Sequence, residues 1–160
     1  MNQNVKAIIT ELITRFDTIP KERQVILDDL RDAIANSLDK NQVANLLYVC
    51  THNSRRSHFG QVAGILAAAY FGIERISCFS AGTEVTAMNK NAVKALLGFG
   101  FTVSANDVID NPVYSFELES MSIINCFSKR FDDASIPNEN VIAIMTCTDA
   151  EQNCPFIPGA

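Results

Sequence analysis

Hydrophobic residues recur at helical spacing through the first forty positions of the chain. Between residues 5 and 16, and again between 25 and 38, they return every three or four positions, which predicts two amphipathic helices. Thr18-Ile19-Pro20 separates the two patterns, and Pro20 suits the first turn of the second helix. We treat residues 1–42 as an N-terminal helical extension. A packing appendage and a homodimer surface are the two alternatives for its role.

Beyond this extension, short hydrophobic runs alternate with helical patterns. The expected elements are strands at 45–50, 75–80, 101–103 and 140–146, and helices at 56–71 and 89–98. The segment 112–128 mixes aromatic and polar residues, and either a strand pair or irregular structure fits it. The alternation predicts an α/β domain over residues 43–160, with an open parallel sheet and helices on both faces.

Composition narrows the range of functions. Hydrophobic residues make up 48% of the 160 positions, which is enough for a sizeable core. The net charge of −5 argues against a nucleic-acid surface or an anionic-membrane surface. No hydrophobic run reaches the ~18 residues that a membrane span needs, and the first residues do not resemble a signal peptide. We therefore expect a cytoplasmic protein without nucleic-acid or membrane partners.

Five cysteines, without a secretion signal, do not predict a disulfide scaffold. Cys78 and Cys126 lie in hydrophobic runs and are expected to be small buried residues. Cys50 ends the first predicted strand, and Cys147 directly follows the last one. Ligands of open α/β sheets bind at the carboxyl ends of the strands. The sequence thus predicts both sulfurs at the same edge of the sheet.

Cys50 opens a short polar loop that leads into a helix at Arg56. The loop consists of Thr51, His52, Asn53, Ser54 and Arg55. Its N–H groups and the positive end of the helix can bind a tetrahedral oxyanion, and the Arg56 guanidinium can bind two oxygens at once. Thiols in such surroundings ionise far more readily than a free thiol. Cys50 is therefore the predicted nucleophile of an oxyanion-binding loop.

Neighbouring side chains are assigned supporting or neutral roles. Asn53 tolerates positive φ and can hold the loop through its amide, while Ser57 can donate a hydrogen bond to the sulfur. Arg55 is expected to be a solvated charge, although it is also a candidate oxyanion contact. His52 and His58 are expected on the loop and helix surface rather than in acid–base roles.

A second cysteine motif runs from Cys147 to Cys154. Six intervening residues are too many for a zinc-binding cysteine pair, and the only histidines are His52 and His58, so no metal or other cofactor is predicted. The intervening segment is polar, and we expect it to be movable. It would have to loop or unwind before the two sulfurs could form a disulfide.

At these residues the chain resembles the superfamily of low-molecular-weight protein tyrosine phosphatases and thioredoxin-coupled arsenate reductases. VCTHNSRRS is similar to the phosphate-binding loop, FSAGTE to the Ser-Ala-Gly turn, and MTCTDAEQNCPFIPG to the redox segment of the reductases. The resemblance covers about Asn45 to Ala160 and leaves out the N-terminal helices. It implies a low-molecular-weight phosphatase-like fold.

The resemblance also implies residue roles. Cys50 would be the nucleophile, with Arg56 and the loop amides as oxyanion binders, and Asn53, Ser57 and Ser80 would support the loop. Cys147 would attack the Cys50 adduct, and Cys154 would then attack Cys147.

Three features depart from the family pattern. His52 replaces a glycine, and Arg55 replaces a frequent cysteine. The family continues past Ala160 to an Asp-Pro loop that supplies a general acid. We therefore expect either a C-terminally truncated domain or an acid from elsewhere, with Asp149 as a candidate.

Three functional hypotheses follow. The first is arsenate reduction through Cys50, Cys147 and Cys154, with a thioredoxin-like reductant. The second is a phosphatase that works through a phosphocysteine on a phosphoprotein or smaller phosphoester. The third is a non-enzymatic module that binds oxyanions or senses oxidants. The alternative to all three is an α/β domain with inert cysteines. Cys147 and Cys154 distinguish the reductase hypothesis from the phosphatase hypothesis, because phosphocysteine hydrolysis needs neither thiol.

Overall fold

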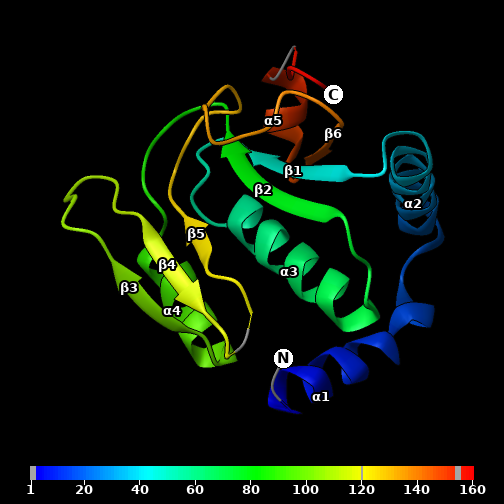
Figure 1. The fold of residues 1–160 in the computed structure, drawn as a ribbon, viewed down its shortest axis with the longest axis horizontal. Helices are drawn as coiled ribbons and strands as arrows, with labels where there is room; N and C mark the ends of the chain where they lie inside the picture. The colour runs from blue at the N-terminus through cyan, green and yellow to red at the C-terminus, as the bar shows by residue number, and fades with distance from the viewer. Residues whose placement is uncertain (1–2, 120, 154–155) are drawn as a thin grey trace.

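The computed structural model describes residues 3–119, 121–153 and 156–160 and shows the predicted α/β architecture (Figure 1). Its main sheet has three parallel strands in the order β2-β1-β6. These strands are β1 (Ala44–Cys50), β2 (Ile76–Gly82) and β6 (Val141–Met145). They match the predicted strands to within two residues at their starts and ends. The open parallel sheet is therefore confirmed.

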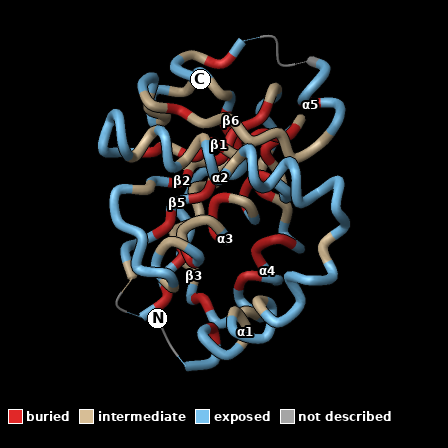
Figure 2. Tube along the Cα trace, turned by 90° about the vertical axis from the view of Figure 1, so that its right-hand side faces the viewer, coloured by how far each residue is buried: buried red, intermediate tan, exposed pale blue. Residues whose placement is uncertain are grey.

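Helices cover both faces of this sheet because the side chains of β1 alternate between them. Leu46 and Tyr48 face α2 (Lys21–Asn41) and α3 (Arg56–Phe71). Leu47 and Val49 face the opposite layer, which contains Ala150 of α5 (Thr148–Asn153). Figure 2 shows the buried positions gathered around the sheet.

Glycine on α3 brings this helix close to the sheet. A Cβ atom at Gly60 would lie 2.4 Å from the Tyr48 ring, and one at Gly64 would lie 2.8 Å from the Tyr48 hydroxyl. Larger residues at these positions would push the helix away from β1. The N-terminus of α3, and the loop before it, are thereby held directly above the end of β1.

A second, antiparallel sheet lies beside α3 and α4 (Lys90–Phe99), as Figure 1 shows. Its order is β3-β4-β5, with β3 at Thr102–Ala105, β4 at Tyr114–Glu117 and β5 at Ile124–Cys126. The strand pair that was one alternative for 112–128 is therefore the observed structure. The predicted strand at 101–103 belongs to this sheet rather than to the parallel one.

The N-terminal helices pack against the domain, although few of their residues are buried. In α1 (Gln3–Ile13), Val5 is fully buried, and the Thr10 hydroxyl lies 3.0 Å from the Tyr70 hydroxyl of α3. A short 3-10 turn, η1 (Phe16–Thr18), leads to α2, which has no fully buried residue. The division of the chain at residue 42 stays a prediction.

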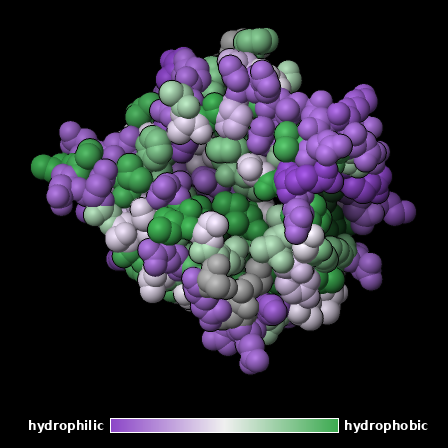
Figure 3. Space-filling model, in the orientation of Figure 1, coloured by the Kyte–Doolittle hydropathy of each residue, from purple (hydrophilic) through white to green (hydrophobic). Residues whose placement is uncertain are grey.

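Hydrophobic side chains of α1, α3 and α4 line a groove of about 420 Å³. In Figure 3, hydrophobic residues form a strip across the middle of the visible face, while hydrophilic residues dominate the region of α2. No helix in the described part of the chain is long and apolar enough to cross a bilayer.

Candidate active site

The end of β1, the start of α3 and the turn after β2 together build the loop from Thr51 to Arg55. Cys50 pairs with Gly82 in the sheet, and its side chain is only 3% exposed. Asn53 adopts a φ of 42°, in the left-handed region that asparagine tolerates. The local backbone thus follows the predicted strand–loop–helix order, with α3 beginning at Arg56.

Carbonyl groups of the loop are bound by segments outside it. The backbone N–H of Thr83 donates to Cys50 O at 3.2 Å, and that of Glu84 donates to Thr51 O at 2.9 Å. The N–H of Asn89 donates to Ser54 O, also at 2.9 Å. Carbonyls that are engaged in this way face outward, which favours an inward arrangement of the loop's N–H groups. Such an arrangement is a nest for an oxyanion.

A chain of hydrogen bonds reaches the Cys50 sulfur. The amide of Asn53 donates to Ser57 Oγ at 2.8 Å, and this oxygen lies 3.1 Å from Cys50 Sγ. Because Oγ accepts from Asn53, its own proton is available to the sulfur, where it stabilises a thiolate. The Lys129 N–H donates to Asn53 Oδ1 at 2.9 Å and fixes the amide orientation. Asn53 and Ser57 are both fully buried.

Ser80, the third predicted support, bonds to α3. Its hydroxyl donates to Gln61 Oε1 at 2.7 Å and lies 3.0 Å from His58 Nδ1. Since the single hydroxyl proton goes to Gln61, we assign the Nδ1–H tautomer to His58. Ser80 therefore holds the first turn of α3, which carries the loop's end.

His58 does not lie on the helix surface, so that prediction was wrong: the side chain is fully buried. Burial lowers the pKa of His58 to about 4, with a further contribution from the Lys129 charge and a smaller opposing one from the Asn53 backbone. Nε2 is buried and has no hydrogen-bond partner among the residues that the structure describes. The prediction failed because the buried face of α3 extends into its first turn through the polar residues Ser57 and His58.

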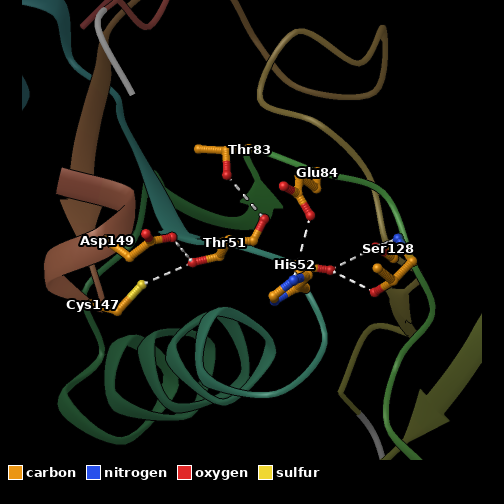
Figure 4. A network of polar contacts seen from close by, with 8 residues as sticks. Thr51, His52, Thr83, Glu84, Ser128, Cys147 and Asp149 are labelled. Atoms are coloured by element: carbon orange, nitrogen blue, oxygen red, sulfur yellow. Dashed lines mark hydrogen bonds and ion pairs between the residues drawn. The ribbon is translucent and has the colours of Figure 1, made fainter. Parts of the chain in front are cut away.

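His52 and Arg55 lie on the loop's outer side, as predicted. The His52 imidazole is 3.4 Å from the Glu84 carboxylate, and both side chains are more than half exposed. Its carbonyl accepts from Thr86 Oγ1 at 3.0 Å and from Ser128 Oγ at 2.9 Å. Two hydroxyls thus fix the backbone at the position where the resemblance expects glycine (Figure 4).

Cys147 lies beside the loop, as the predicted shared sheet edge requires. Its sulfur is 3.6 Å from Thr51 Oγ1, which donates to Asp149 Oδ2 at 2.6 Å (Figure 4). Burial raises the pKa of Cys147, but hydrogen bonds from Thr51 and from the Ala150 backbone, together with the Arg56 charge, outweigh it and lower the pKa. Cys154, its predicted partner, lies outside the described residues.

The structure also places Arg56, Ser54 and the segment that follows Cys147. Arg56 is the first residue of α3, and its side chain is exposed. The Ser54 hydroxyl donates to Ala87 O at 2.8 Å. The segment between the two cysteines forms α5 over Thr148–Asn153, in which Ala150 is fully buried, and its ability to move stays a prediction. Within residues 3–119, 121–153 and 156–160, no three side chains form a metal-binding cluster.

Residues that sequence reasoning missed form the back wall of the loop. Ser128 and Lys129 follow β5 and are buried; they bond to His52 O and Asn53 Oδ1. Asn111 holds Ser128 in turn, because it donates to Ser128 O at 2.7 Å and accepts from Ser128 N at 3.0 Å. No local motif marks these positions, since they act only through contacts distant in sequence.

These features define a class of protein. A buried cysteine ends a parallel strand, a loop whose carbonyls are bound from outside and a helix N-terminus follow it, and a second thiol lies on the same sheet edge. This is the arrangement of a cysteine-dependent oxyanion site on a low-molecular-weight phosphatase-like fold.

Comparisons with known proteins agree with this class. Arsenate reductase 1 of Staphylococcus epidermidis is 27% identical over 119 residues, which cover 73% of this chain and 70% of the relative. An arsenate reductase of Staphylococcus aureus is 29% identical over 117 residues, which cover 71% of this chain and 67% of the relative. The arsenate reductase of Bacillus subtilis is 30% identical over 115 residues, which cover 71% of this chain and 63% of the relative. No family model matches, and neither does any solved structure.

The resemblance predicted from the motifs is therefore confirmed. This chain is similar to arsenate reductases, which is consistent with the superfamily that they share with the low-molecular-weight protein tyrosine phosphatases.

Proposed function

We propose that this protein reduces arsenate through a thiol cascade of Cys50, Cys147 and Cys154, with a thioredoxin-like dithiol as reductant. The names of the curated relatives support this activity. The observation that carries the proposal is the position of Cys147, whose sulfur lies 3.6 Å from Thr51 Oγ1 at the oxyanion loop. Hydrolysis of a phosphocysteine needs no second thiol there.

The first step joins arsenate to Cys50. The loop N–H groups, the positive end of α3 and the Arg56 guanidinium hold the oxyanion. The Cys50 thiolate, which receives the Ser57 hydrogen bond, attacks arsenic. An arsenate hydroxyl group takes up a proton and leaves as water, so a sulfur–arsenic bond replaces an arsenic–oxygen bond.

The second step carries out the reduction. The Cys147 thiolate attacks the Cys50 sulfur, and the electron pair of the sulfur–arsenic bond stays with arsenic. Arsenic passes from the +5 to the +3 state and leaves as arsenite, while the two sulfurs form a Cys50–Cys147 disulfide. The Cys154 thiolate then attacks Cys147 and releases Cys50 as a thiolate. The reductant dithiol reduces the resulting Cys147–Cys154 disulfide.

Mass mapping of arsenate-treated variants tests this order. Cys154→Ser should trap the Cys50–Cys147 disulfide, and Cys147→Ser should stop before any disulfide forms. Cys78→Ser is the matched control, because Cys78 is buried, its pKa is raised to about 12, and it has no role in the cascade. If both Cys147→Ser and Cys154→Ser reduce arsenate like the wild type, the cascade through these two thiols fails, and if the wild type does not reduce arsenate, the reductase hypothesis fails. The phosphatase hypothesis then takes its place, with p-nitrophenyl phosphate hydrolysis as its assay. Inactivity on both substrates would leave the non-enzymatic module.

A further inference from the structure

Helix α3 has buried polar residues and an exposed hydrophobic face. No charged residue occurs between Ser57 and Phe71, and the polar residues Ser57, His58 and Gln61 are buried. A helix at the surface normally carries charged residues on its outer face, whereas a helix that is hydrophobic on all sides is covered on all sides. The outer face of α3 is therefore a surface that a further element should cover.

Four residues form a row along this outer face, each four positions from the next. Phe59, Ala63, Ala67 and Phe71 are exposed, and all four line the groove of about 420 Å³ that α3 forms with α1 and α4. Residues at this spacing lie on one ridge of a helix. Every groove-lining residue that the structure describes is hydrophobic, so these residues offer no polar side chain that would orient a small ligand. The groove therefore suits a hydrophobic protein surface better than a small molecule.

The row has the same order of residue types in both directions, Phe-Ala-Ala-Phe. In a two-fold symmetric dimer, one surface meets a second copy of itself, so it must complement itself. Antiparallel α3 helices near the two-fold axis would bring Phe59 next to Phe71 of the partner subunit, and Ala63 next to Ala67 of the partner subunit. The small central residues allow a close approach of the helices, and the phenylalanines cover the two ends of the contact.

Charge and area are both compatible with this contact. The net charge of −5 opposes association of two copies, but the row itself carries no charge. On α1, Glu11 and Arg15 form an ion pair with each other. Four large groove residues are between 38% and 54% exposed, namely Leu12, Phe16, Phe59 and Phe71. At about 200 Å² for a large side chain, they expose roughly 400 Å², close to the apolar part of the ~800 Å² that each partner buries in a standard interface.

We propose that the groove face is a homodimer interface, in which the α3 rows of two copies of this chain pack antiparallel across a two-fold axis. The segment of α1 and η1 lies beside the C-terminal half of α3 and contributes Leu12 and Phe16 (Figure 1). The N-terminal extension then supplies part of the subunit interface, which is one of the two roles predicted for it. This inference does not depend on the proposed arsenate chemistry.

Sedimentation equilibrium of the full chain between about 1 and 100 µM tests the interface. We expect the wild type to have twice the mass of one chain. Ala67→Glu should have the mass of one chain, because a dimer would bury the new carboxylate without a partner. Glutamate is a good helix former, so this variant should keep its fold, as circular dichroism and urea denaturation would show. Ala69→Glu is the matched control, because it adds the same charge to α3 at an exposed position outside the groove, and it should stay dimeric.

Phe71→Ser is a second disruptive variant, which decides the question if Ala67→Glu does not fold. A wild type that is monomeric over the whole concentration range would overturn the proposal, and uptake of a fluorescent fatty acid by that monomer would assign the groove to a ligand. Dimers that persist in the folded variants would place the interface elsewhere.

Disulfide cross-linking tests the antiparallel order of the two helices. Under mild oxidation, an equimolar mixture of Ala63→Cys and Ala67→Cys should form linked dimers faster than either variant alone, because the two positions face each other only between different variants. Equal rates in the mixture and in the separate variants would overturn this order.

Discussion

His58 should make the stability of this protein depend on pH in a window where few other groups titrate. The imidazole is fully buried beside Ser80, and burial and the Lys129 charge favour its neutral form against a smaller opposing effect of the Asn53 backbone. The unfolded chain takes up a proton on this residue below about pH 6.5, whereas the folded protein does so only near pH 4. Stability is therefore complete above about pH 6.5 and falls progressively between about pH 6.5 and pH 4.

The two pKa values set the size of the effect. Over the whole window, the difference between 6.5 and about 4 corresponds to a loss of about 3 kcal/mol, of which about 2 kcal/mol is lost by pH 5. This is a large part of the ~5–15 kcal/mol that stabilises an ordinary domain. Carboxylates such as Asp133, whose pKa is lowered by the Ser135 hydroxyl, also contribute to acid sensitivity. A variant comparison is needed to isolate the histidine.

Urea denaturation at pH 7.5 and pH 5 provides this comparison. In His58→Asn, the amide can still donate to Ser80 but does not titrate, so its loss of stability between the two pH values should be about 2 kcal/mol smaller than that of the wild type. His52→Asn is the control, since the chain has two histidines and this one is exposed. Equal pH dependence in His58→Asn and wild type would refute the burial argument, whatever the stability of the variant at pH 7.5.

Two further predictions concern the oxyanion loop, with calorimetric titration of phosphate as the measurement. Arg56→Lys should weaken binding about tenfold, because an ammonium cannot bind two oxygens as a guanidinium does. The neighbouring Arg55→Lys is the control and should have little effect. Equal affinities of the wild type and both variants would exclude Arg56 from the site. Gly82→Ala should weaken binding by at least about tenfold, since its Cβ would lie 2.6 Å from both Asn53 N and Thr51 O. Gly98→Ala is the control, because a Cβ at Gly98 meets nothing within 4 Å. Retained affinity in Gly82→Ala would show that the loop does not depend on this close approach.

Local patterns were enough to predict the parallel sheet and the loop. The strand ending at Cys50 and the strand before Cys147 are short hydrophobic runs, and parallel strands bring their carboxyl ends to one edge. Asn53 was expected to tolerate positive φ and does adopt it. Each of these inferences depends only on a few neighbouring residues and on the geometry of parallel sheets.

Long-range packing decided the features that could not be predicted. The segment 112–128 has no clear period because its strands are only three or four residues long. Ala150 anchors the polar segment after Cys147, yet one alanine among polar residues gives no hydrophobic pattern. His58 was misplaced because hydrogen bonding to Ser80, 22 residues away, makes the burial of its ring tolerable.

The chemistry and the rigidity of the site therefore come from different parts of the chain. The proposed nucleophile, the proposed nest and Arg56 lie within seven consecutive residues, so a local motif encodes them. The groups that hold this motif follow β5: Ser128 binds the His52 carbonyl, and the Lys129 N–H fixes the Asn53 amide that orients Ser57 toward the sulfur. The hydrogen bonds that reach the Cys50 sulfur through Ser57 and Asn53 therefore depend on a backbone N–H that lies 76 residues from Asn53, in the segment that follows the second sheet.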